Sequence, residues 1–135
     1  MAILEWSASC SVGVAAIDAE HKHFFALLNR LYDSVIDGSA NNATTRTLAD
    51  EVLDYVITHC RHEEEMLEAA RYPGLDEMRR QHETLQATVR DFRRKLTVHG
   101  GVTLELANYL LEWTLRHVLK EDKKCGAFLN AAGIY

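Results

Sequence analysis

Proline and cysteine are scarce in this chain of 135 residues, and long apolar runs are absent. The one proline, Pro73, lies in the segment RYPG, so the rest of the chain is free of the residue that most strongly breaks helices. The three cysteines, Cys10, Cys60 and Cys125, are widely spaced and form no Cys-x-x-Cys pair. An odd, scattered set does not make a disulfide framework and is typical of reduced thiols in a reducing compartment.

A membrane-spanning segment and a basic surface are also lacking. The longest apolar run near the N-terminus, VGVAAI, is far shorter than the roughly 20 residues that a bilayer requires. Glu5 and the lack of a basic leader argue against a signal peptide, which predicts a cytoplasmic protein. The net charge is -5 and basic residues are mixed with acidic ones, so we expect neither a nucleic-acid nor a membrane partner.

Apolar residues recur at helical spacing in four long segments. We predict helices at residues 18–37, from residue 44 or 45 to residue 71, at 75–96 and at 103–120. The third segment has the clearest pattern, because Leu75, Met78 and His82 begin a series of alternating steps of three and four residues. Asp18 is the predicted N-cap of the first helix.

Four such helices joined by short connections predict an all-α fold, an antiparallel up-down-up-down four-helix bundle, as one domain over residues 1–135. Gly38 and the pair Gly100–Gly101 are expected to break the chain between helices. Residues 1–17, which contain Trp6, should form an arm along the bundle, and residues 125–135 a short C-terminal helix. With 47% hydrophobic and 26% charged residues, the composition is that of a globular domain.

Polar side chains interrupt the apolar face of every predicted helix. They are His21 in the first, His59 and Glu63 in the second, His82 in the third, and His117 with Asp122 towards the end of the fourth. Burying charged groups without compensation costs several kcal/mol each, which rivals a total stability of about 5–15 kcal/mol. Direct pairing of glutamate with histidine offsets part of this cost, but convergence from four helices is better explained by a bound cation.

The spacing of these residues fits a shared centre. His59 and Glu63 are four residues apart and therefore project from adjacent turns of one helix face. His117 and Asp122 are five apart, a rotation of about 140°, so Asp122 joins only if the helix ends or bulges there. The segment KEDKKCG is typical of an ending. Imidazole with carboxylate favours iron, zinc or manganese, and two carboxylates allow a bridged pair of ions.

Two other kinds of helical metal site do not match. The ferritin-like di-iron pattern requires two Glu-x-x-His pairs, and the one pair here is Glu20 with His23. The zinc-protease motif His-Glu-x-x-His is absent from the sequence.

The chain resembles the bacterial hemerythrins. The segments VGVAAIDAEHKHFFALLNRLY, HCRHEEEML, YPGLDEMRRQH and WTLRHVLKEDKKCG are similar to the motifs of that family's four helices, in the same order. The resemblance covers almost the whole chain. It implies a non-haem di-iron centre that binds oxygen reversibly at the iron held by His21 and His59.

The resemblance also implies the rest of the ligand set. The second iron would be held by histidines of the third and fourth helices, here His82 and His117. Glu63, Asp122 and an oxo or hydroxo group would bridge the two ions. The family's third-helix motif is His-x-x-x-His, and Met78 stands at the first of those positions.

A thioether is a soft, neutral donor and a poor substitute for imidazole on ferric iron. We therefore expect water or a vacancy at the position of Met78 rather than a sulfur–iron bond. Replacement of the lost ligand by Glu77 or His62 stays open, although both are rotated about 100° away from the inner face.

Four residues are implied to line the oxygen pocket. Trp113 and Val118 supply apolar walls, while Cys60 and Thr114 stand where the family commonly has phenylalanine and leucine. A smaller and more polar pocket keeps water and protons away from bound oxygen less well.

Three functions follow from these features. We favour an oxygen-binding protein for storage, delivery or sensing, with any signal passed to a separate redox or signalling protein. An enzyme that reduces peroxide, oxygen or nitric oxide is the second hypothesis, because Met78, Cys60 and Thr114 open and polarise the site. A bundle with one metal ion or none, acting as an interaction module, is the third.

Overall fold

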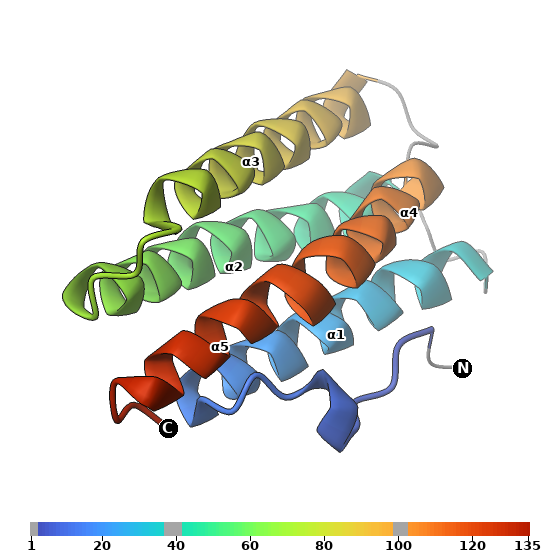
Figure 1. Cartoon of the computed structure of the whole chain (residues 1–135). Coiled ribbons are helices and arrows are strands. Elements are labelled where there is room, and N and C mark those ends of the chain that lie inside the picture. The colour runs from blue at the N-terminus through green and yellow to red at the C-terminus, as the bar shows by residue number, and fades with distance from the viewer. Residues whose placement is uncertain (1–2, 37–41, 99–102) are drawn as a thin grey trace.

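The computed structural model describes residues 3–36, 42–98 and 103–135, and within these ranges it contains helices and no strand. The helices are α1 (Ala15–Ile36), α2 (Asn42–Ala69), α3 (Leu75–Val98), α4 (Thr103–Trp113) and α5 (Asp122–Ala131). A π-helical segment, η2 (Thr114–Glu121), joins α4 to α5, so the three make one rod. Figure 1 shows four rods side by side that alternate in direction, which confirms the predicted antiparallel bundle.

The first helix begins at Ala15, three residues before its predicted N-cap. Asp18 lies in the first turn, and its carboxylate accepts a hydrogen bond from the backbone N–H of Val12 at 2.9 Å and another from the Ser11 hydroxyl. The prediction of Asp18 as N-cap is therefore wrong, because this side chain holds the turn that precedes the helix. The predicted helix end at residue 37 and the predicted breaks at Gly38 and Gly100–Gly101 lie outside the described residues.

The second helix begins at Asn42 and ends at Ala69, two residues earlier than predicted. Arg71 has a φ of 58°, and the N–H of Tyr72 donates to the carbonyl of Leu67 at 2.9 Å. The left-handed conformation of Arg71 and this hydrogen bond, which spans five residues, are the two features of a Schellman motif. The motif ends the helix before Pro73.

The fourth rod does not end at KEDKKCG, so that prediction is wrong. The backbone N–H of Asp122 donates to the carbonyl of His117, five residues earlier, which is the hydrogen bond of a π-helix. The five-residue spacing of His117 and Asp122 allowed either a helix end or a bulge, and the structure has the bulge. The chain then continues as α5 because Cys125 and Leu129 are buried in an apolar cluster with Val12 of the arm.

Residues 3–14 form an arm along the bundle, with one 3₁₀ turn at Ala8–Cys10, and the arm ends three residues before the predicted residue 17. The ring of Trp6 meets that of Phe25 edge-on, with ring centres 5.4 Å apart. At the other end of the arm, the side chain of Asn130 in α5 donates to the carbonyl of Gly13 at 2.9 Å. The arm is thus fixed to both α1 and α5.

The apolar side chains form two clusters. The larger one fills the bundle with residues such as Phe24, Leu28 and Leu106. The smaller one contains Met78 and Leu67, so Met78 keeps the core register that the sequence predicts. In the described part of the chain, no helix has both the length and the apolar character required to cross a membrane.

Gly126 is in close contact with the arm, and a Cβ atom there would lie 1.9 Å from the carbonyl oxygen of Val12. We expect Gly126→Ala to push the arm away from α5 and to lower the free energy of unfolding by about 1–3 kcal/mol. Ala127→Ser, at an exposed position of the same helix, is the control and should change it by less than about 0.5 kcal/mol. Urea unfolding followed by circular dichroism measures both variants. Equal midpoints for Gly126→Ala and the unmodified chain would contradict this packing.

Candidate metal centre

Six polar side chains from all four rods are buried together inside the bundle. They are His21 on α1, His59 and Glu63 on α2, His82 on α3, His117 on η2 and Asp122 at the start of α5. None is more than 3% exposed. The structure therefore brings together every residue that the sequence predicts as a metal ligand, with Met78 as a separate case.

The side chains form two groups of potential metal donors. In the first, one donor atom each of His21, His59, Glu63 and Asp122 lie within 4.8 Å of one another. The second group combines Glu63 with His82 and His117 under the same limit. Two groups that share a carboxylate are the arrangement expected for two neighbouring cations rather than one.

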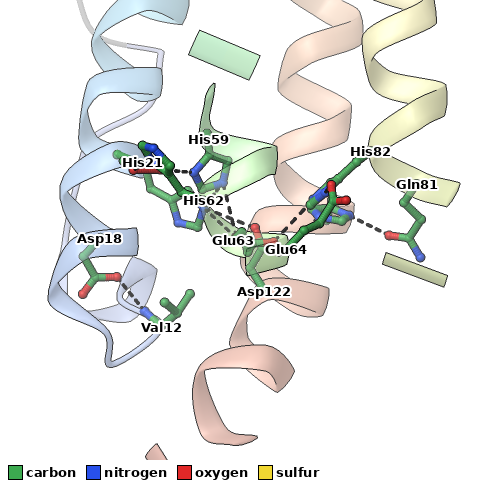
Figure 2. Close-up of polar contacts among 12 residues, drawn as sticks. Val12, Asp18, His21, His59, His62, Glu63, Glu64, Gln81, His82 and Asp122 are labelled. Carbon is green, nitrogen blue, oxygen red and sulfur yellow. Dashed lines mark hydrogen bonds and ion pairs between the residues drawn. The ribbon is translucent and has the colours of Figure 1, made fainter. Parts of the chain in front are cut away.

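The two carboxylates lie between the pairs of imidazoles, as Figure 2 shows for Glu63 and Asp122. Oε2 of Glu63 is 3.3 Å from Nε2 of His59, and its Oε1 is 3.4 Å from Nε2 of His82. Oδ2 of Asp122 is 3.2 Å from Nε2 of His21, and its Oδ1 is 3.1 Å from Nε2 of His117. Each carboxylate thus offers one oxygen to either side.

Most of these atoms make no aligned hydrogen bond despite their short separations. Among the described residues, the buried side-chain atoms without a partner are Nδ1 of His21, Nε2 of His82 and of His117, and both carboxylate oxygens of Glu63 and of Asp122. Buried polar atoms in native proteins are nearly always satisfied, so seven unpaired atoms in one cluster require an explanation. Nitrogen and carboxylate donors of this kind suit iron, zinc or manganese, and a cation pair would satisfy them.

The outer ring nitrogens of three histidines are held by further polar side chains. Nδ1–H of His59 donates to Oε1 of Glu20 at 2.7 Å, and Nδ1–H of His82 donates to Oε2 of Glu64 at the same distance. Nδ1–H of His117 donates to Oε1 of Gln81 at 2.6 Å. Such bonds fix the tautomer and turn Nε2 towards the centre as a lone-pair donor, as in known metal sites.

The sequence did not single out Glu64 and Gln81, and it gave Glu20 no role towards His59. Each lies off the apolar stripe of its helix, where an acid or amide is ordinarily a solvated surface residue. A weak signal is available, since Glu64 and Gln81 are adjacent in sequence to Glu63 and His82.

Aromatic rings cover two of the histidines. Tyr55 stacks on His59 with ring centres 5.3 Å apart and planes 7° apart. Trp113 stacks on His117 at 4.3 Å and 18°. These rings restrict the orientation of the imidazoles that they cover.

The protonation equilibria of the centre are strongly shifted. Burial lowers the pKa of His59, but the hydrogen bond with Glu20 and the nearby carboxylate of Glu63 raise it to about 10. Burial also lowers the pKa of His82, while contacts with Cys60 and Glu63 raise it to about 11. Burial acts to raise the pKa of Glu63, yet the nearby imidazoles of His59 and His82 hold it well below the usual value. A cation would have to displace protons from these imidazoles.

Met78, Glu77 and His62, the residues considered for the place of the lost histidine, have other contacts in this structure. Met78 is buried in the smaller apolar cluster. The Glu77 side chain is 58% exposed and is bonded to Arg80. His62 is 44% exposed, and its Nδ1–H donates to Oε2 of Glu20 at 2.8 Å. Neither Glu77 nor His62 belongs to the two donor groups found in the described part of the chain.

The four residues expected around an oxygen pocket are buried or half-buried beside the centre. Cys60, Thr114 and Val118 are fully buried, and Cys60 contacts His82. The hydroxyl of Thr114 donates to the carbonyl of Leu110 at 2.8 Å. Because that bond satisfies the hydroxyl, Thr114 adds less polarity to its surroundings than the sequence alone predicts.

Known proteins are similar to this chain in sequence and in fold. The family model described as Hemerythrin HHE cation binding domain matches residues 12–129. Bacteriohemerythrin of Stenotrophomonas maltophilia is 31% identical over 91% of this chain and 79% of that protein. Bacteriohemerythrin of Methylococcus capsulatus is 27% identical over 97% of this chain and 100% of that protein. A crystal structure of wild-type hemerythrin matches with a TM-score of 0.87 and 25% identity, covering 95% of this chain and 98% of that one.

We expect the metal-free chain to lose stability as the pH rises from about 6.5 towards 10 to 11. The pKa values of His59 and His82 are higher in the folded chain than the ordinary 6.5, so their protonation stabilises the fold fully below 6.5 and is lost above their folded values. Glu63 has a lowered pKa, so its contribution is present above its ordinary 4.5 and disappears as the pH falls.

Urea midpoints between pH 3 and 11 measure this dependence. Glu20→Gln removes a partner of His59 and should reduce the alkaline decline, whereas Glu65→Gln, at an exposed position, should not. A midpoint that rises between pH 7 and 10 would contradict the assigned shifts.

Proposed function

Because this chain belongs to the hemerythrin family, we propose that it binds dioxygen at a pair of iron ions held in the middle of the bundle. The observation that carries the proposal is the placement of Glu63 and Asp122, each with one oxygen towards either pair of imidazoles. Bridging carboxylates are what a two-iron centre requires of its protein, and one mononuclear site would leave half of these oxygens unused.

We infer the ligand set from the two donor groups. His21 and His59 would hold one iron, and His82 and His117 the other. Glu63 and Asp122 would bridge them together with an oxo or hydroxo group. When bound, such a pair would provide the chemistry of reversible two-electron reduction of dioxygen.

The protein's own contribution is orientation and exclusion of water. Glu20, Glu64 and Gln81 hold three imidazoles by their outer nitrogens, so Nε2 faces inwards without the need for rearrangement. Oxygen would bind on the side of His21 and His59, in a pocket walled by the residues that the family resemblance implies. They are Cys60, Trp113, Thr114 and Val118.

A second candidate function, reduction of peroxide, dioxygen or nitric oxide, is favoured by one observation. Each side of the centre has two histidines and one oxygen of each carboxylate. Met78, packed in the apolar cluster, stands where the family has a further histidine. Two equally open metal ions can both accept an external ligand, which suits turnover better than reversible carriage. The buried, apolar position of Thr114 and Val118 favours carriage instead, because it keeps water out.

We also infer that residues 1–135 form a single hemerythrin-like domain in the cytoplasm. The family model covers residues 12–129, and the arm and α5 pack on the same bundle. Cys10, Cys60 and Cys125 are all free thiols, which suits a reducing compartment.

Reconstitution with iron tests the function. The chain is loaded anaerobically with ferrous iron, the iron per chain is counted, and the near-ultraviolet and visible bands are followed on adding air. Two irons and a band that disappears on deoxygenation are the expected result. Two irons that oxidise at once and then consume added peroxide would instead support the enzyme. One iron or none would refute both functions.

Met78→His should raise iron occupancy on the side of His82 and slow autoxidation, because it restores an imidazole where the family motif has one. Met78→Leu is the matched control, since it keeps an apolar side chain of similar volume in the cluster. We expect Met78→Leu to bind as much iron as the unmodified chain, counted by elemental analysis. A loss of iron in Met78→Leu would show that the thioether sulfur is a ligand.

A further inference from the structure

A solvent-accessible pocket of about 470 Å³ lies between α3 and the fourth rod, on the side of His82 and His117. Gln81 and Thr84 of α3 line it from one side, and Tyr109, Trp113 and His117 from the other. Its volume is within the range of about 300–1,000 Å³ found for pockets that bind small molecules. Trp113 is shared with the proposed oxygen pocket, but Gln81, Thr84 and Tyr109 are not, so that pocket does not account for the whole opening.

The pocket leads directly to the centre through stacked rings. Trp113 lines the pocket with one part of its ring system and stacks on His117 with ring centres 4.3 Å apart. Gln81, which also lines the pocket, accepts the Nδ1–H of His117 at 2.6 Å. A molecule seated here would contact both groups that hold this candidate ligand in place.

The charges at the rim are already paired. Arg80 is bonded to Glu77, and Arg116 to Glu112 at 2.9 Å. Glu121 is 3.3 Å from the ammonium group of Lys124. An anionic ligand would have to break these ion pairs, whereas an uncharged molecule with hydrogen-bonding edges would not.

A second pocket on the opposite side of the bundle has a different character. Tyr55 lines it and stacks on His59, but three carboxylates, of Glu20, Glu51 and Asp54, also line it. Each pocket is thus lined by an aromatic ring that stacks on a histidine of the centre, Trp113 in one and Tyr55 in the other. They differ because carboxylates line the pocket beside Tyr55. This contrast provides an internal control.

We propose that the pocket beside Trp113 binds an uncharged, planar, redox-active ring of the isoalloxazine class and is the site where electrons enter the centre. The ring stacks against the aromatic wall, as planar bases stack on tryptophan and tyrosine. The uncharged reduced ring would give up two electrons and two protons. One electron would pass to each of the two ferric ions by way of Trp113 and His117, and both protons would go to solvent. The role in reduction rests on the proposed di-iron function; the binding of the ring does not.

Binding is tested by titrating riboflavin into the full iron-loaded chain and following the quenching of flavin fluorescence. We expect saturable binding that Thr84→Phe weakens by about tenfold or more, because the new ring fills the pocket. Thr58→Phe is the matched control, an exposed threonine that lines the acidic pocket beside Tyr55. It should leave the affinity unchanged, and flavin mononucleotide should bind as riboflavin does because the arginines are already paired.

Electron entry is tested with riboflavin reduced beforehand by hydrogen over palladium. Loss of the ferric absorption bands should slow by about tenfold in Thr84→Phe, in line with its weaker binding, and not in Thr58→Phe. Dithionite, which needs no ring site, should reduce all three proteins equally. Equal riboflavin affinity, or equal reduction rates by riboflavin, in Thr84→Phe and the unmodified chain would overturn the proposal.

The two proposals fail in different ways. A chain that binds riboflavin at this pocket but retains no iron would overturn the di-iron function and the electron route, and would leave the ring site supported. A chain that holds two irons but shows no saturable riboflavin binding would overturn the ring site alone.

Discussion

The burial of two carboxylates among four imidazoles is the constraint on which the rest of this structure depends. Glu63 is 0% exposed and Asp122 1% exposed, and the oxygens of both lack aligned hydrogen bonds among the described residues. Uncompensated, such groups cost enough free energy to rival the stability of a domain of this size. A bound cation pair converts the same cluster into a source of folding free energy. Each rod must therefore bring its donor to one level, which fixes the register of the bundle.

Periodicity predicted the bundle and the six donors because both depend on which helix face a residue occupies. His59 and Glu63 lie on one face of any α-helix, so their convergence follows from spacing alone. Asp122 was the one predicted donor that an ideal helix would not bring to the centre, since it faces His117 only if the helix ends or bulges between them. The sequence favoured an ending at KEDKKCG, and the structure has a π-helical bulge instead. That choice depends on contacts of Cys125 and Leu129 with a distant arm, which no local pattern contains.

The remaining errors have the same physical origin. Asp18 has the right residue type for an N-cap, but its carboxylate is taken by the turn before the helix. Glu64 and Gln81 look like surface residues until the position of each partner histidine is known. Long-range partners decide each of these cases.

The arm that precedes α1 contacts α5, the helix that begins with Asp122 of the centre. Asp122 is the first residue of α5, and four residues later Gly126 lies against the backbone of Val12. Val12 is in turn held by the carboxylate of Asp18 on α1, one turn before His21. The arm therefore connects the helix that begins with Asp122 to the helix that carries His21, whose Nε2 is 3.2 Å from Oδ2 of Asp122. The close approach that glycine permits at position 126 therefore helps to set the position of Asp122 in the centre as well as the packing of the arm.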